Sequence, residues 1–203
     1  MAVEAGSENG LFPADETTKT YLEGRARAEW TPVASDGDAG FARRLTVDLD
    51  RLAPLVAKPW SPGNIAPLAE VVGTPVDQVY VGNCSNGTIT DLRQAASMLA
   101  GRKVNPRTRA IVVPATLRIY AQALAEGLLD VFVEAGAMVS TPTCGACFGG
   151  SNGILADGEV AVATTNRNFR GRMGATTSGI YLANAYVAGA AAGAGELVDP
   201  ASL

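Results

Sequence analysis

The chain contains no histidine, a residue that often serves as a general base and a metal ligand in proteins. This absence excludes every mechanism in which the chain itself supplies a histidine base, and it excludes zinc sites of the Cys2His2 type. Cysteine is also scarce, with three residues in 203. In a cytoplasmic chain, three cysteines indicate metal binding or catalysis rather than disulfides.

Aromatic residues are few, at 6%, while hydrophobic residues make up 47% of the chain and glycine is plentiful. This composition favours tight helix–sheet packing around a sizeable core. The net charge of −4 argues against a nucleic-acid partner, because neutralising phosphates requires clustered lysine and arginine. The apolar run at 182–195 is too short and glycine-rich to span a membrane, and no secretory signal is visible. We therefore expect a cytoplasmic protein with no membrane partner.

The first quarter of the chain has weak and mixed patterns. Residues 15–25 predict a helix with Asp15 as its N-cap, and residues 43–52 alternate like a strand. Residues 54–71 contain four prolines and no clear period, which predicts a linker or a crossing between domains. We expect residues 1–57 to be the C-terminal part of one α/β domain and residues 58–203 to form a second, fuller domain.

The rest of the chain alternates between strand and helix patterns. Strands are predicted at 76–82, 109–115, 137–140, 159–165 and 179–184. Helices are predicted at 90–102, with Thr90 or Asp91 as cap, and at 118–136 and 185–195, and a glycine-rich helix or loop at 145–157. This alternation predicts an α/β fold with a mostly parallel sheet and helices on both faces.

Three of the predicted strands are followed by chemically interesting residues. The first ends in 83-NCSNG-87 with Cys84, another ends in 141-TPTCGAC-147 with Cys144 and Cys147, and a third ends in 166-NRNFRGR-172. Ligands of open parallel sheets bind outside the carboxyl ends of the strands. We therefore expect the three cysteines, with nearby asparagines and arginines, to meet at one rim of the sheet.

Several interpretations of these cysteines are open. Cys84 alone could be a buried small hydrophobic residue. A redox pair of Cys144 and Cys147 leaves Cys84 unexplained, and a structural zinc site needs four ligands where the chain offers three thiolates. An iron–sulfur cluster held by three cysteines fits the count and leaves one iron open to a substrate oxygen.

Three motifs give the chain a resemblance to a known family. They are 81-VGNCSNGTITDLR-93, 141-TPTCGACFGG-150 and 164-TTNRNFRGRMG-174, and 1-MAVEAGSENGLFPADETT-18 is a weaker match. Together they resemble the aconitase superfamily of iron–sulfur hydro-lyases, over nearly the whole chain and in the expected order. The likeness is nearest to large subunits of the dehydratases that act on isopropylmalate or homologous acids. It implies an aconitase-like α/β/α domain preceded by the tail of a similar domain.

The resemblance also implies roles for individual residues. A 4Fe–4S cluster would be ligated by Cys84, Cys144 and Cys147, and Asn166 would lie beside its sulfurs. Arg167 and Arg172 would bind substrate carboxylates, in keeping with the bidentate geometry of guanidinium. Glu4 would match an active-site glutamate. Without the resemblance, the arginines would be read as part of a solvated turn and Glu4 as an ordinary surface residue of a helix.

The sequence departs from the family at two points that matter. The family usually has a serine before its first cysteine, where this chain has Asn83. Family large subunits are also about twice as long, and their first half carries histidine and aspartate residues of the active site. The chain therefore resembles a C-terminal half, which would need that missing half and a small subunit carrying a serine base.

The function implied is the dehydration and rehydration of a hydroxy di- or tricarboxylic acid. Isopropylmalate, in leucine biosynthesis, is the first choice, and homocitrate, citrate or a dimethylmalate-type acid remain open. Two other classes of function also remain open. One is a non-catalytic cluster-binding fragment that is inert without the missing half, and the other is a thiol redox protein using Cys144 and Cys147.

Overall fold

The computed structural model describes residue 2 and residues 6–203. The chain divides into two compact units, Met1–Leu52 and Ala53–Leu203. Strand β1, at Leu55–Ala57, pairs with strands of the second unit. We expected residues 1–57 and residues 58–203 to belong to two different aconitase-like domains, and this division stays a prediction.

The described residues of the first unit contain one short α-helix, α1, at Glu16–Leu22. Asp15 caps it as predicted, since its carboxylate accepts a hydrogen bond of 2.8 Å from the backbone N–H of Thr18. The predicted strand at 43–52 was wrong, because this stretch forms only a 3-10 turn, η2, at Leu49–Arg51. An alternating pattern gives a strand only where a partner strand is present, and the described residues of this unit contain none.

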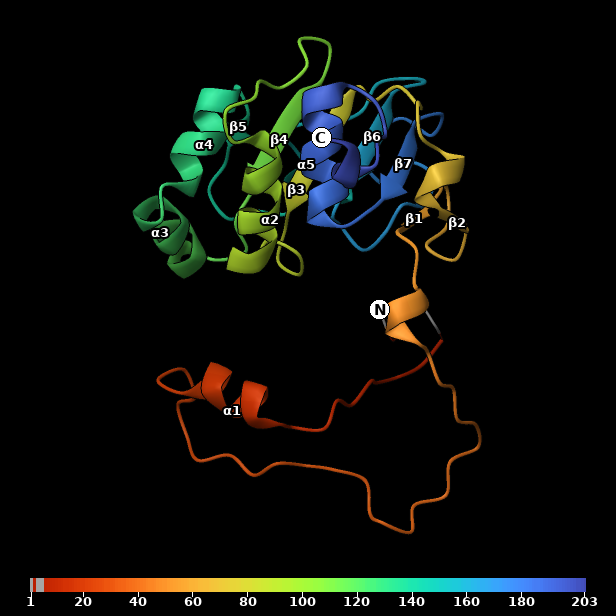
Figure 1. Cartoon of the computed structure of the whole chain (residues 1–203), viewed down its shortest axis with the longest axis vertical. Coiled ribbons are helices and arrows are strands. Elements are labelled where there is room, and N and C mark those ends of the chain that lie inside the picture. Colours follow the sequence, from red (N-terminus) through yellow and green to blue (C-terminus); the bar gives the residue numbers. More distant parts are fainter. Residues whose placement is uncertain (1, 3–5) are drawn as a thin grey trace. The chain divides into compact units, whose positions relative to one another are not determined.

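The second unit is built on a seven-stranded sheet of order β2-β1-β7-β6-β3-β4-β5 (Figure 1). The remaining strands are β2 Ile65–Pro67, β3 Gln78–Gly82, β4 Arg109–Val113, β5 Met138–Val139, β6 Val160–Ala163 and β7 Gly179–Leu182. The pairs from β7 to β5 are parallel, whereas β1 is antiparallel to both β2 and β7. The predicted α/β fold with a mostly parallel sheet is confirmed.

The hairpin of β1 and β2 lies in the stretch that was expected to be a linker, and that prediction was wrong. The prolines mislead because they lie at positions where a strand tolerates them. Pro54 precedes β1, and Pro67 is the last residue of β2, which is the edge strand of the sheet. An edge strand can lose one N–H donor without leaving a neighbour unpaired.

The helices of the second unit follow the predicted order with two differences. They are α2 Ile89–Leu99, α3 Leu117–Ala125, α4 Leu128–Ala135 and α5 Ala185–Ala194, with 3-10 turns η3 Leu68–Glu70, η4 Gly145–Phe148 and η5 Pro200–Ser202. The helix predicted at 118–136 is divided into α3 and α4, because Gly127 adopts a φ of +72° between them. Helix α2 is capped by Thr88, with Asp91 completing a capping box, rather than by Thr90 or Asp91.

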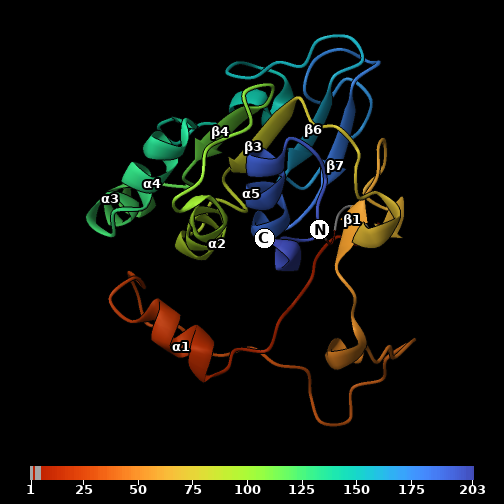
Figure 2. The ribbon, with the colours of Figure 1, turned by 45° about the horizontal axis from the view of Figure 1, so that its top comes forward.

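The two faces of the sheet are covered differently. Val79, Val81 and Val112 belong to a core that they share with α2, α4 and α5, and Figure 2 shows α2 and α5 beside the strands. Tyr80 and Ile111, which alternate with these valines, belong to a second core. That core is closed by η4 and by side chains of the later loops, including Leu155 and Met173. Within this chain, loops and a short 3-10 turn therefore form the layer that carries two of the cysteines.

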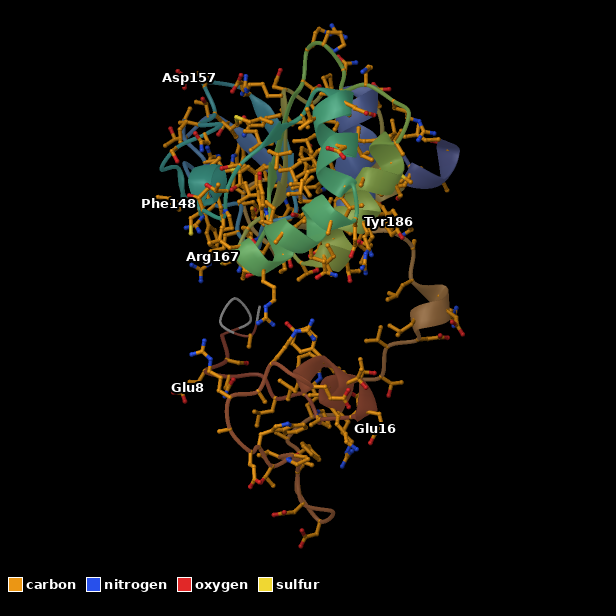
Figure 3. The ribbon with its side chains drawn as sticks, turned by 90° about the vertical axis from the view of Figure 1, so that its left-hand side faces the viewer. Glu8, Glu16, Phe148, Asp157, Arg167 and Tyr186 are labelled. Atoms are coloured by element: carbon orange, nitrogen blue, oxygen red, sulfur yellow. The ribbon has the colours of Figure 1, made fainter. Side chains whose placement is uncertain are left out.

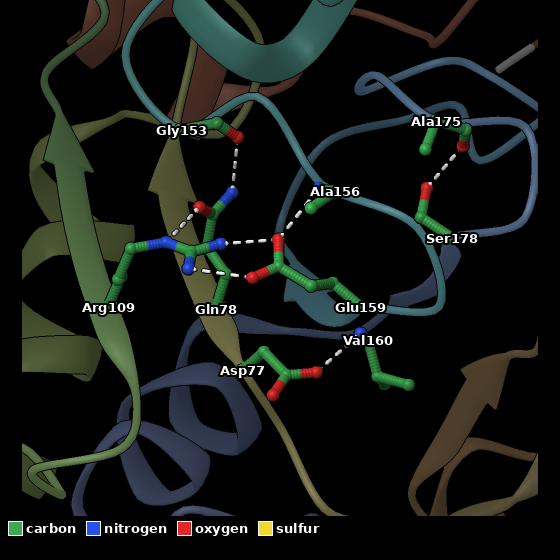
Figure 4. Close-up of polar contacts among 9 residues, drawn as sticks. All are labelled: Asp77, Gln78, Arg109, Gly153, Ala156, Glu159, Val160, Ala175 and Ser178. Atoms are coloured by element: carbon green, nitrogen blue, oxygen red, sulfur yellow. Dashed lines mark hydrogen bonds and ion pairs between the residues drawn. The ribbon is translucent and has the colours of Figure 1, made fainter.

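A polar network joins the amino ends of β3 and β4 to the loop before β6 (Figure 4). Arg109 donates to both carboxylate oxygens of Glu159, at 2.8 and 2.6 Å, and its Nε donates to Gln78 at 3.1 Å. Gln78, which is fully buried, donates in turn to the carbonyl of Gly153 at 2.7 Å. The hydrogen bonds from Arg109 lower the pKa of Glu159. This end of the sheet is thus fixed by charge-assisted bonds, while the cysteines follow the opposite ends of the strands.

Candidate functional site

The turn after β3 begins at a glycine whose backbone is tightly enclosed. Gly82 has a φ of +108°, and a Cβ at this position would lie 1.9 Å from the carbonyl oxygen of Val113. Its N–H donates to the hydroxyl of Thr164 on the neighbouring chain segment at 2.8 Å. Only glycine fits this backbone conformation and this space, so the sequence sharply defines where β3 ends and the turn begins.

Asn83 shapes the remainder of that turn from a buried position. Its side-chain oxygen accepts hydrogen bonds from the N–H groups of Ser85 and Asn86, both at 2.8 Å. This is the turn that an asparagine side chain can form with the backbone two and three residues further on. Cys84 is consequently exposed, which rules out the interpretation of Cys84 as a buried core residue.

The second cysteine segment is a single 3-10 turn. The N–H of Cys147 donates to the carbonyl of Cys144 at 2.9 Å. Gly145 adopts a φ of +47°, and a Cβ there would lie 3.0 Å from the hydroxyl oxygen of Tyr80. Cys144 is exposed and Cys147 is buried, and all three cysteines of the chain are unpaired. The turn therefore presents the two thiols in different environments.

Tyr80 and Asn83 bring the two cysteine segments together. Tyr80 is fully buried, and its hydroxyl donates to the carbonyl of Cys144 at 3.1 Å. Asn83 donates from its amide nitrogen to the sulfur of Cys147 at 3.5 Å. Burial raises the pKa of Tyr80, and the negative charges of Cys147, Cys144 and Cys84 raise it further. The two hydrogen bonds therefore join the turn after β3 to the segment that carries Cys144 and Cys147.

The arginine segment after β6 is anchored by a buried asparagine that the sequence interpretation did not single out. Asn168 is fully buried, and its amide nitrogen donates to the carbonyl of Lys58 at 2.8 Å and to that of Ile180 at 3.1 Å. The backbone of Arg172 lies close to the second cysteine segment. A Cβ on Gly149, two residues after Cys147, would lie 3.2 Å from the carbonyl oxygen of Arg172. The third motif therefore reaches the second.

A cation–π contact adds to this anchoring. The guanidinium carbon of Arg170 lies 3.7 Å from the ring centroid of Trp60, and the indole N–H of Trp60 donates to the carbonyl of Ser178 at 2.8 Å. Trp60 belongs to the connection between β1 and β2. The hairpin missed from the sequence thus supports the loop that carries the predicted carboxylate-binding arginines.

The predicted polar residues of this segment differ in their surroundings. Asn166, Arg167 and Arg172 are each partly buried, and Figure 3 labels Arg167 at the edge of its unit. Within the described residues, the Nε of Arg172 is a buried donor without a hydrogen-bond partner. Such a group is costly to leave unpaired, and a carboxylate would satisfy it. Glu4 lies outside the described residues.

The donor set suits an iron–sulfur cluster better than a single metal ion. No three His, Cys, Asp or Glu side chains in residue 2 and residues 6–203 are close enough together to hold one ion. In a cluster each cysteine binds a different iron, so the sulfurs need to surround a larger volume. Thiolates are the protein ligands of such clusters, and an amide N–H aimed at one of them is a typical support. The residues present therefore fit this group.

The fold and the thiol site together define a class, an α/β protein with a cysteine-rich site at the carboxyl ends of parallel strands. The sequence model of the family described as "Aconitase family (aconitate hydratase)" matches residues 1–75 and 69–195 of the chain. The chain belongs to the aconitase family. Membership of this family implies an iron–sulfur cofactor. Separately, none of the helices in the described residues is both long enough and apolar enough to cross a membrane.

Named relatives cover the whole chain. A protein of Rubrobacter xylanophilus, "3-isopropylmalate dehydratase large subunit 2", is 63% identical over 203 residues, which are 100% of this chain and 48% of that protein. Proteins named "3-isopropylmalate dehydratase large subunit" from Syntrophus aciditrophicus and Nautilia profundicola are 52% and 50% identical, over 48% and 49% of their lengths. The chain spans about half the length of the curated relatives it matches.

Proposed function

We propose that this chain is the cluster-bearing half of an iron–sulfur hydro-lyase large subunit. The observations that carry the proposal are two contacts that join the cysteine segments, from the Tyr80 hydroxyl to the carbonyl of Cys144 and from the Asn83 amide to the sulfur of Cys147. In the proposal, a 4Fe–4S cluster is ligated by Cys84, Cys144 and Cys147. When bound, such a cluster supplies an iron that acts as a Lewis acid toward a substrate oxygen.

The other residues of the site would bind and orient the substrate. Arg167 and Arg172 would bind substrate carboxylates. The Nε of Arg172 supports this role, because it is a buried donor without a hydrogen-bond acceptor among the described residues. Asn166 would donate a hydrogen bond beside the cluster, and Glu4 would act as the active-site glutamate. The net reaction removes a hydroxyl group and a neighbouring proton as water and adds water back in the opposite orientation.

The substrate and partners follow from the relatives. Three relatives named as 3-isopropylmalate dehydratase large subunits favour isopropylmalate, and hence leucine biosynthesis, as the first choice. The words "large subunit" support a small subunit as partner, which would supply the proton-removing base. Because this chain spans about half of those relatives, the other half of the large subunit would complete the site.

Iron and sulfide reconstitution tests the cofactor proposal. The chain is incubated anaerobically with both, and its iron content and its electron paramagnetic resonance after mild oxidation are measured. We expect a three-iron signal that added ferrous iron converts back, and we expect Cys84→Ser, Cys144→Ser and Cys147→Ser each to lose it. Ser140→Ala, which changes a nearby exposed hydroxyl, is the matched control. A full cluster in the Cys144→Ser protein would refute the ligand assignment.

Activity separates the remaining alternatives. With the missing half of the large subunit and the small subunit added, the proposal predicts isopropylmalate dehydration, whereas a non-catalytic cluster-binding fragment predicts bound iron and no turnover. A thiol redox protein predicts a reversible disulfide between Cys144 and Cys147 and no bound iron. The exposed position of Cys84, in a turn that Asn83 joins to the sulfur of Cys147, favours a role for all three cysteines.

A further inference from the structure

Asn83 is neither a proposed cluster ligand nor a proposed substrate-binding residue, yet the fold holds it in an unusual conformation next to the cysteines. It is 1% exposed and has a φ of +130°, which is unfavourable for a residue other than glycine. Its own N–H donates to the carbonyl of Val113 at 3.2 Å, and its carbonyl accepts from Gly87 at 3.0 Å. A strained and buried backbone that is bonded on both sides indicates that the direction of this side chain is fixed by the fold.

The amide of Asn83 can point in only one sense. Its oxygen accepts from the backbone N–H groups of Ser85 and Asn86, and these donors cannot bond to an NH2 group. The nitrogen must therefore face the other way, where it lies 3.5 Å from the sulfur of Cys147. The orientation of the amide follows from its neighbours.

From this geometry we infer that Asn83 is a positioning residue whose N–H···S hydrogen bond fixes the Cys147 sulfur and offsets its negative charge as a cluster ligand. The inference rests on the proposed iron–sulfur function. Groups that hydrogen-bond to metal ligands orient them and tune the metal, and their loss lowers metal affinity about 10- to 100-fold. A serine side chain, which the resemblance gives as usual at this position, is shorter and would not span the same distance.

The hydrogen bond can be tested in the cluster-free full chain. Hydrogen–deuterium exchange of the side-chain amides is followed by NMR, and the Asn83 signal is identified by its loss in Asn83→Asp. We expect the Asn83 amide to exchange several-fold faster in Cys147→Ala than in the wild type. The amide of Asn105, which donates to the carbonyl of Ala194 at 2.9 Å, is the internal reference and should not change. Equal exchange of Asn83 in both proteins would overturn the hydrogen bond.

Its effect on the cluster is tested after reconstitution. Asn83→Asp keeps the two acceptor bonds of the turn and replaces the donor by a negatively charged oxygen, while Asn83→Gly removes the side chain without adding a charge and suits the positive φ. In both variants we expect ferrous iron to pass to a chelator about 10- to 100-fold faster and the reduction potential to fall. Asn105→Asp, which makes the same kind of change far along the chain, should behave as the wild type.

The outcomes separate the inference from the function on which it rests. A wild-type chain that loads the cluster, together with variants that release iron at the wild-type rate, would overturn the role of Asn83 and leave the proposed function intact. A wild-type chain that binds no iron, alone and with the missing half supplied, would overturn both. Circular dichroism of each variant establishes that the change in iron release does not come from unfolding.

Discussion

Replacing Gly82 by alanine should destabilise the second unit strongly. Its φ of +108° alone costs an L-residue about 1–2 kcal/mol. The added Cβ would also lie 1.9 Å from the carbonyl oxygen of Val113, so the ends of β3 and β4 would have to separate. That movement breaks the N–H bonds from Gly82 to Thr164 and from Asn83 to Val113, each contributing about 1 kcal/mol. We expect the free energy of unfolding to fall by about 3–4 kcal/mol.

Urea denaturation followed by circular dichroism measures this loss, and Gly158→Ala is the matched control. Gly158 also has a positive φ, of +74°, but a Cβ there would have no atom within 4 Å. We expect the control to lose only about 1–2 kcal/mol, the cost of the left-handed backbone. If Gly82→Ala loses no more than Gly158→Ala, the argument from the close approach to Val113 is wrong. A displaced turn should also reduce iron loading, since Cys84 follows two residues later.

Three further predictions concern other parts of the second unit. Tyr80→Phe removes the donor to the carbonyl of Cys144 and should lower the free energy of unfolding in urea by about 1–2 kcal/mol, and an unchanged value would contradict the bond. Glu159 has a lowered pKa because Arg109 bonds to it, so its stabilisation should be present above pH 4.5, the ordinary glutamate value, and be lost below it. The difference in thermal stability between wild type and Glu159→Gln should therefore shrink on acidification, and a constant difference would refute this. Phe132→Ala, at a fully buried position of α4, should cost about 3–5 kcal/mol in the same urea assay, and a loss below 1 kcal/mol would mean that the core closes over the gap.

The regular part of the fold could be predicted because local pattern and tertiary contacts agree there. The strand at 76–82 and the helix at 185–195 carry apolar residues that the structure buries, and both were found within a few residues. The helix at 118–136 was predicted as one element because its apolar period continues through Gly127. Only the positive φ of that glycine interrupts it, and a single glycine inside a helical pattern does not reveal this.

The errors elsewhere come from pairing, which a local pattern does not contain. Residues 43–48 alternate without forming a strand, whereas residues 55–57 and 65–67 form strands among prolines. In both cases the presence or absence of a neighbouring strand decided the outcome.

The site was partly predictable for a similar reason. The cysteines could be placed because each follows a recognisable strand, and the ends of parallel strands meet at one edge. Tyr80 could not be assigned, since an aromatic residue inside a buried strand gives no sign of which neighbour its hydroxyl will meet. Asn83 was noticed only as a departure from the family pattern, and its contact with Cys147 depends on the turn formed by Ser85 and Asn86.

The position of the cysteine segments in the sheet has a consequence for the order of events during folding. Cys84 follows β3 and Cys144 follows β5, and β4 lies between these strands. Two right-handed crossovers, through α2 and through α3 and α4, must therefore close before the thiols can meet. Closing such long connections is entropically slow compared with forming the helices themselves. A newly made chain would thus present scattered thiols first and an assembled site only late, so iron capture should follow folding rather than guide it.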